Sequence, residues 1–243
     1  MPHLSPEAVL ILTSLLLAQT RLRSRVSLYQ LARSTSLSMA TVYRKAAELS
    51  RLGLLLKLGR GSYVITPRGS FYLATIALED GKPEQVLRAA VARLKNDWGL
   101  EEFTDEEVEA YVRLVSIGLQ KLGRPPLGFC ADDFGRTVQV LLPPKFSGYD
   151  VVDMIAQHLG VPTEMVKRAE RVIAKAILEF FPSIRLPDGC RSVVIPHGEY
   201  GLKLTPLAAY CRASGYTLGL KCTYGRVALM RIFQKDENKG NIT

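Results

Sequence analysis

The sequence is poor in the residues and motifs on which catalytic and cofactor sites most often depend. Its 243 residues include three histidines and four cysteines, and no two cysteines form a C-x-x-C pair. No phosphate-binding glycine loop, dinucleotide-binding glycine motif or G-x-S-x-G motif occurs. We therefore predict no cofactor, no metal site and no enzymatic activity. We expect the reduced thiols of a cytosolic protein at Cys130, Cys190, Cys211 and Cys222.

Two weak signals for chemistry remain, and each has a plainer interpretation. His197 lies in "IPHGEYG" (195–201), the one segment that resembles an active-site loop, but a lone His-Gly-Glu turn is more often structural. A zinc site with His197 has no ligand spacing to support it. Asp132-Asp133 could bind a cation, yet without partners at ligand spacing an exposed loop pair is the better interpretation.

The sequence also lacks a long hydrophobic run. "VLILTSLLLA" (9–18) is too short to span a bilayer, and its arginines follow rather than precede it, unlike those of a signal peptide. We interpret it as a buried helix. We expect a cytoplasmic protein with no membrane segment.

Acidic residues are scarce in the first third of the chain. Residues 1–78 hold ten Lys and Arg but only Glu7 and Glu48, a net +8 out of the total of +9. A generally basic surface would not segregate in this way. The excess predicts an acidic partner for this part of the chain, and nucleic acid is the first candidate.

Three serines mark expected helix starts in the same region: Ser5, Ser27 and Ser38. Ser27 is followed three residues later by glutamine, which is the capping-box pattern. The third helix should end near Leu52, because Gly53 can take the left-handed conformation that closes a helix. Two apolar runs then flank a glycine-bearing tip at residues 59–61, which predicts a β-hairpin, and "TPRG" starts a further helix.

The third helix, in "LSMATVYRKAAELSRLGLL" (37–55), has two faces of different character. Val42, Ala46 and Leu49 recur at helical spacing and predict the buried face. The opposite face combines small residues with long donors, as a helix that approaches base edges in a major groove requires. We predict DNA contacts from this helix and the following hairpin, through Ser38, Met39, Ala40, Thr41, Tyr43, Arg44, Lys57, Arg60 and Arg68.

These residues have different expected roles. Arg44 can donate two hydrogen bonds to a guanine edge, and Tyr43 can reach a phosphate or a thymine methyl group. Thr41 and the amides at the helix start can hold a phosphate. Arg60 lies between two glycines, so the hairpin tip fits beside or into the minor groove, with the neighbouring basic residues on phosphates.

The order helix, helix, turn, helix, glycine, hairpin and "TPRG" helix resembles the winged helix-turn-helix domain of MarR/PadR-type regulators. The resemblance rests on "LYQLARSTSLSMATVYRKAAELSRLGLLLK" and "GRGSYVITPRGSFYL", and it covers residues 5–78. It implies a DNA-binding domain whose third helix is the recognition helix. Winged helices also serve as protein-docking modules, but that interpretation leaves the +8 unexplained.

We expect an α+β fold, mainly α, in two domains. Residues 1–80 form the winged helix domain and residues 81–243 a C-terminal α/β domain. The latter should be helical over 82–182 and strand-rich over 183–234, with a disordered tail over 235–243.

A weaker helix-turn-helix signal lies in "VVDMIAQHLGVPTEMVKRA" (151–169), where Ala156, Gly160 and Val166 have the required spacing. With its flanks it faintly resembles a cyclin repeat of general transcription factor B. A possible second DNA contact is the basic stripe Lys167, Arg171 and Lys175. The alternative is a solvated helix face with ion pairs such as Glu164–Arg168.

We therefore expect a prokaryotic, archaeal-type transcription regulator that binds double-stranded DNA as a homodimer, with half-sites about 34 Å apart. The helices at 83–97 and 104–122 are candidates for the dimer seam, and the C-terminal domain could bind a small-molecule effector or a protein. The alternative is an accessory factor of replication, plasmid partition or basal transcription that docks its winged helix on a protein. An enzyme with an appended DNA-binding domain would rest only on residues 195–201.

Overall fold

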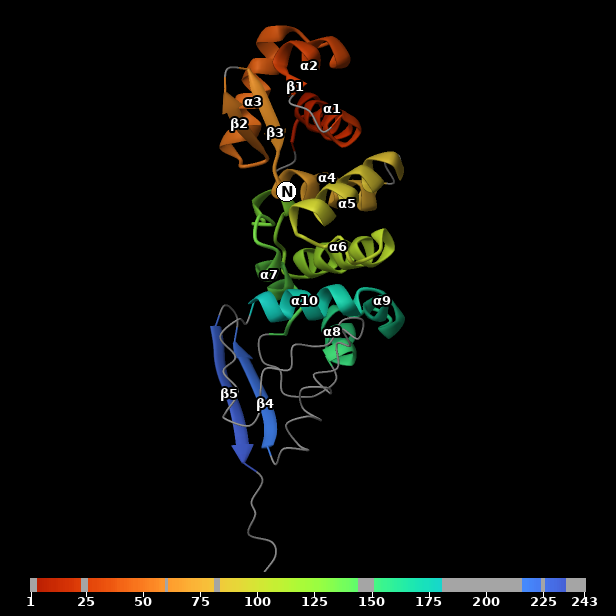
Figure 1. Cartoon of the computed structure of the whole chain (residues 1–243), viewed down its shortest axis with the longest axis vertical. Coiled ribbons are helices and arrows are strands. Elements are labelled where there is room, and N and C mark those ends of the chain that lie inside the picture. The colour runs from red at the N-terminus through yellow and green to blue at the C-terminus, as the bar shows by residue number, and fades with distance from the viewer. Residues whose placement is uncertain are drawn as a thin grey trace, which may run out of the picture. The chain divides into compact units, whose positions relative to one another are not determined.

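The computed structural model is mainly helical with small antiparallel sheets, so the predicted α+β, mainly α class is confirmed (Figure 1). The structure describes residues 4–22, 26–59, 61–80, 84–143, 151–180, 216–223 and 226–234. Contacts group the chain into two compact units, Met1–Phe134 and Gly135–Thr243.

The first unit begins with helices and a three-stranded sheet and continues with helices. Its elements are α1 (Pro6–Leu22), β1 (Val26–Ser27), α2 (Leu28–Thr35), α3 (Met39–Arg51), β2 (Leu55–Gly59), β3 (Ser62–Ile65), α4 (Pro67–Asp80), α5 (Glu84–Asp97), α6 (Asp105–Lys121) and the short 3₁₀ helix η1 (Pro126–Gly128). The helices and the hairpin expected between residues 5 and 80 are all present.

Capping explains where these helices start. The Ser27 hydroxyl accepts from the Gln30 N–H while the Gln30 side chain accepts from the Ser27 N–H, so the predicted capping box opens α2. Thr104 and Glu107 form the same motif at α6. Gly53 follows α3 with φ +73°, the conformation that the sequence predicted for it.

The sheet has the order β1-β3-β2, all antiparallel, and β2 is an edge strand (Figure 1). The buried amide of Gln19 ties α1 to the central strand. Its Nε2 donates to the Tyr63 carbonyl at 2.9 Å, and its Oε1 accepts from the Ile65 N–H at 3.0 Å. These bonds satisfy buried backbone groups at two positions of one strand, and they fix the helix against the sheet.

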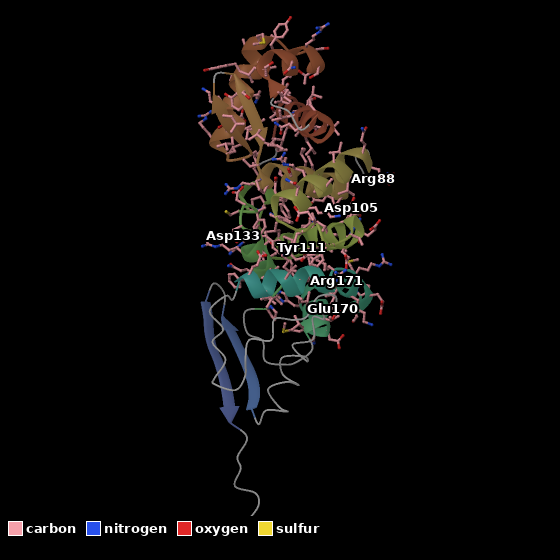
Figure 2. The ribbon with its side chains drawn as sticks, viewed as in Figure 1. Arg88, Asp105, Tyr111, Asp133, Glu170 and Arg171 are labelled. Carbon is pink, nitrogen blue, oxygen red and sulfur yellow. The ribbon has the colours of Figure 1, made fainter. Side chains whose placement is uncertain are left out.

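The helical part of the first unit is built on α4, α5 and α6, which pack on one another. Tyr111 is fully buried there, with its ring 6.3 Å from that of Trp98 and 5.5 Å from that of Phe134 (Figure 2). The Trp98 indole donates to the Ala131 carbonyl at 2.9 Å. This cluster anchors the segment after α6 to the end of α5.

The expected division at residues 80–81 falls inside the first unit. Helix α5 packs against both α1 and α4, and its Val86, Ala90 and Leu94 are buried. The contacts of α5 therefore join the expected N-terminal domain to the helices after it. The winged helix domain expected over residues 1–80 stays a prediction.

The second unit contains helices and a β-hairpin. Its elements are η2 (Val138–Val140), α8 (Val151–Leu159), α9 (Thr163–Arg168), α10 (Glu170–Phe180), β4 (Tyr216–Thr223) and β5 (Arg226–Gln234), while α7 (Phe134–Thr137) starts at the division between the units. Within the region expected to be strand-rich, "YTLGLKCTY" and "RVALMRIF" have the composition of strands, and β4 and β5 form there and pair antiparallel. The other expected strand, "SVVIP", and the tail at 235–243 lie outside the described residues.

The stretch "TVQVLLPP" (137–144) is compatible by sequence with a strand or with the end of a helix. In the structure α7 ends at Thr137 and η2 covers Val138–Val140, while residues 141–143 belong to no helix or strand. The apolar spacing in "TEMVKRAERVIAKAILEFF" (163–181) predicts one amphipathic helix. That prediction is wrong, because α9 ends at Arg168 and α10 begins at Glu170. Ala169 between them has φ −102° and ψ 4°, outside the helical range.

A candidate nucleic-acid interface on α3 and the hairpin

Helix α3 begins at Ser38, whose side chain caps the helix through hydrogen bonds with Thr41. The Ser38 Oγ accepts from the Thr41 N–H at 3.1 Å and lies 2.9 Å from the Thr41 Oγ1, a hydrogen bond in which either hydroxyl can be the donor. This cap fixes the start of the helix. Both hydroxyl groups are engaged with each other, so they are less available to a phosphate than the sequence suggested.

The predicted inward face of α3 is buried. Val42, Ala46 and Leu49 are fully inaccessible to solvent, and the helix packs on α1 and α2 through this side. Burial of three apolar side chains at helical spacing holds α3 in one rotation about its axis. The opposite residues must therefore point outward.

The outward face of α3 is open to solvent over its first turns. Met39 is 46% exposed and Tyr43 59% exposed, and both Ala40 and Arg44 are exposed. Apolar side chains that lie together on one exposed face can mark an interaction surface. The sequence grouped these four residues together, and the structure places them on one accessible face.

The two basic residues in the middle of α3 have different surroundings. Lys45 Nζ lies 2.9 Å from a carboxylate oxygen of Glu48, and the Lys45 side chain is only 14% exposed. Arg44 is exposed. Helix α3 therefore presents Arg44 as the cation at the centre of its open face, while Lys45 neutralises an acid on the same helix.

Glu7, near the start of α1, interacts electrostatically with the basic residues Lys45 and Arg44 of α3. Hydrogen bonds from its own backbone N–H and from the Ser5 hydroxyl lower the pKa of Glu7, and the positive charges of Lys45 and Arg44 lower it further. Glu7 is thus ionised at neutral pH beside the basic part of α3. Sequence analysis counted this acid but did not place it there.

The hairpin adds a basic and apolar edge. Lys57 in β2 is exposed, as are its neighbours Leu56 (54%) and Leu58 (45%). Because β2 pairs on one side only, these side chains belong to an edge strand. Arg60, predicted for the hairpin tip, lies outside the described residues.

Arg68, at the start of α4, is engaged within its own unit. Its Nη2 lies 2.8 Å from Asp132 Oδ2 and 3.2 Å from the Cys130 Sγ. Partial burial opposes the charged guanidinium, but the hydrogen bond to Cys130 and the charge of Asp132 outweigh it and raise the pKa of Arg68. We therefore leave Arg68 out of the proposed interface.

The second basic stripe is not a continuous helix face. Lys167 belongs to α9 and pairs with Glu164 at 2.9 Å, whereas the sequence favoured Arg168 as the partner of that acid. Arg171 and Lys175 belong to α10 and are half-buried, and both have interactions with other groups. Figure 2 labels Arg171 next to Glu170 at the start of α10. Lys167 therefore takes part in a local ion pair, and a second DNA contact through this stripe stays a prediction.

Sequence analysis missed one exposed aromatic residue. Tyr29, in the first turn of α2, is 67% exposed. The only signal was its position outside the apolar spacing of Leu28, Leu31 and Ala32, which are buried. An exposed tyrosine in α2 can donate to a phosphate or pack on a partner side chain.

The weak catalytic and metal signals find no support in the described part of the chain. No group of three or more His, Cys, Asp or Glu side chains there is placed to hold a metal ion. Asp132 pairs with Arg68, and Asp133 lies exposed in the next position (Figure 2). The His197 loop lies outside the described residues. Among the helices that are described, none has the length and apolar character needed to cross a bilayer.

Comparisons with protein-family models, with curated protein sequences and with solved structures found no match to this chain. The geometry of α3 and of the hairpin therefore carries the functional argument.

Proposed function

We propose that the protein binds double-stranded DNA through α3, within a winged helix-turn-helix arrangement, and that it regulates transcription as a homodimer. The observation that carries this proposal is the open face of α3, where Arg44 and Tyr43 are exposed on the same side as Met39 and Ala40. A helix with small residues and an exposed cationic donor such as Arg44 on its free side fits a major groove.

Charge supports the same assignment. Ten basic residues against two acids in residues 1–78 give this part of the chain +8. Such a field favours a polyanion through counterion release, whatever its sequence. Lys57 on the exposed hairpin edge is suited to a phosphate, and Arg44 to a base edge.

The homodimer rests on the size of the interface. One winged helix buries a small area, so high specificity favours two copies on half-sites about 34 Å apart. The apolar faces of α5 and α6 are buried inside a single chain, in contacts with α1 and α4 and with each other. A dimer seam on these helices would therefore use the residues of α5 and α6 that stay exposed.

The test is selection of bound sequences from a random duplex pool with the full-length protein. We expect a consensus with two related half-sites. A duplex affinity that is weak even at low salt, or that shows no dependence on salt, would contradict the proposal.

A second function has one observation in its favour. Large side chains with apolar surface are exposed on α2, α3 and β2, at Tyr29, Met39, Leu56 and Leu58. Such residues also suit docking on a protein, as an accessory factor would require. A pull-down with the full chain after nuclease treatment separates the two functions, because only protein docking survives the loss of DNA.

A further inference from the structure

The open face of α3 is unusual in what it offers to base edges. Bidentate reading of adenine uses Asn or Gln, and reading of cytosine N4 uses Asp or Glu. Helix α3, "MATVYRKAAELSR", contains no Asn, Gln or Asp, and its one Glu, Glu48, is paired with Lys45 at 2.9 Å. Direct reading of adenine and cytosine by this helix is therefore disfavoured.

The other exposed side chains of α3 suit guanine and thymine. The exposed guanidinium of Arg44 suits the O6 and N7 acceptors of guanine. Met39, Ala40 and Tyr43 are exposed and present carbon atoms along the first turns of the helix. The one apolar group that a base pair displays in the major groove is the C5-methyl group of thymine.

Resting on the proposed function, we infer that α3 selects its DNA site mainly by contact of Met39, Ala40 and Tyr43 with thymine methyl groups, with Arg44 on a single guanine. The large exposed fractions of Met39 and Tyr43 follow from this role. Their apolar surface leaves water when the helix enters a groove lined by methyl groups. Ala40, exposed on the same face, has a side chain small enough to let the helix axis approach.

The experiment compares thymine with deoxyuridine, which lacks only the C5-methyl group and keeps every hydrogen-bonding atom. A site selected from the random pool is prepared with each thymine replaced in turn, and affinity for the full-length protein is measured by fluorescence anisotropy at fixed salt. We expect at least two positions in each half-site where the replacement weakens binding about threefold to fivefold, the value of one buried methyl group.

Variants assign the effect to residues. In Met39→Ala and in Tyr43→Ala, the loss of affinity caused by deoxyuridine should disappear at one position of the DNA site and persist at the other positions. Leu10→Ala, which removes an exposed apolar side chain from α1 (42% exposed), is the matched control and should keep every penalty. Because all three side chains are exposed, thermal unfolding should be unchanged.

The outcomes separate this inference from the proposed function. Specific binding that is indifferent to deoxyuridine, or a consensus without thymine, overturns the inference and leaves DNA binding standing. Penalties that persist in both variants also overturn it, because other residues would then contact the methyl groups. Absence of duplex binding at low salt overturns the proposed function and the inference together.

Discussion

The Arg68 guanidinium lies 2.8 Å from the carboxylate of Asp132, which joins the first turn of α4 to the segment that follows α6. The Arg68 backbone N–H is also directed at this carboxylate, at 3.4 Å. An arginine that the sequence assigned to phosphate binding is thus paired with an acid 64 residues away in the chain. Arg68 is therefore a basic residue that stabilises the fold, in contrast to the exposed basic residues that can contact a partner.

Arg68→Ala and Lys57→Ala should therefore behave differently. We expect Lys57→Ala to weaken duplex binding and to reduce the slope of log affinity against log salt by about 1, since one phosphate contact is lost. Arg68→Ala should leave the slope unchanged and lower the free energy of unfolding by about 1 kcal/mol or less, as for a partly exposed ion pair. Salt titrations by fluorescence anisotropy measure the slopes. Equal loss of slope in the two variants would show that Arg68 leaves Asp132 to bind DNA.

Glu7 should oppose DNA binding through its charge. Its carboxylate is ionised beside Arg44 and Lys45, so Glu7→Gln should raise duplex affinity about twofold to threefold at low salt and have no effect at high salt. Glu106→Gln is the matched control, because Glu106 also has a pKa lowered by backbone and hydroxyl hydrogen bonds at a helix start, but lies near Asp105 and Lys95. An increase of the same size in both variants would point to total charge rather than to the position of Glu7.

Gly69 is required by a close approach between α4 and the start of β2. A Cβ atom at position 69 would lie 2.4 Å from the Leu54 carbonyl oxygen and 2.8 Å from Ile65. Gly69→Ala should therefore lower the free energy of unfolding by about 1–3 kcal/mol, the usual cost of overpacking. Gly59→Ala is the control, because a Cβ there meets nothing within 4 Å, and it should change stability by less than about 0.5 kcal/mol. Chemical denaturation measures both, and equal stabilities would contradict the close contact.

Gln19 should be a larger determinant of stability than its polar side chain suggests. Gln19→Leu leaves the Tyr63 carbonyl and the Ile65 N–H buried without their partner, which should cost about 2–4 kcal/mol in the free energy of unfolding. Gln120→Leu removes an exposed amide that donates to Glu79 at 2.7 Å, and should cost less than about 1 kcal/mol. If the two variants have the same denaturation midpoint, the bridge from α1 to β3 does not contribute as the geometry implies.

Local signals predicted local structure well. The serine caps, the capping box at Ser27 and the left-handed Gly53 set the ends of helices through bonds between residues three or four apart, so they can be inferred from the sequence. Long-range pairing could not be inferred in this way. The bond from Gln19 to β3 and the pair between Arg68 and Asp132 depend on how distant segments fold together.

The same distinction applies to the candidate site. Apolar spacing on α3 was enough to predict which face is buried, and hence that Met39 and Tyr43 point outward. It could not show that Lys45 is paired with Glu48, or that Glu7 lies near α3. Charge counts treat all basic residues alike, whereas the fold removes some of them from the surface offered to a partner.

The most direct test of the account is duplex binding by Arg44→Ala. The parent protein should bind a selected duplex with an affinity that falls steeply with salt, and Arg44→Ala should bind about tenfold or more weakly, as expected for loss of one bidentate base contact. Arg124→Ala, which removes an exposed arginine after α6, should bind as the parent does. If Arg44→Ala folds normally and binds the duplex as tightly as the parent at moderate salt, α3 is not the helix that reads DNA.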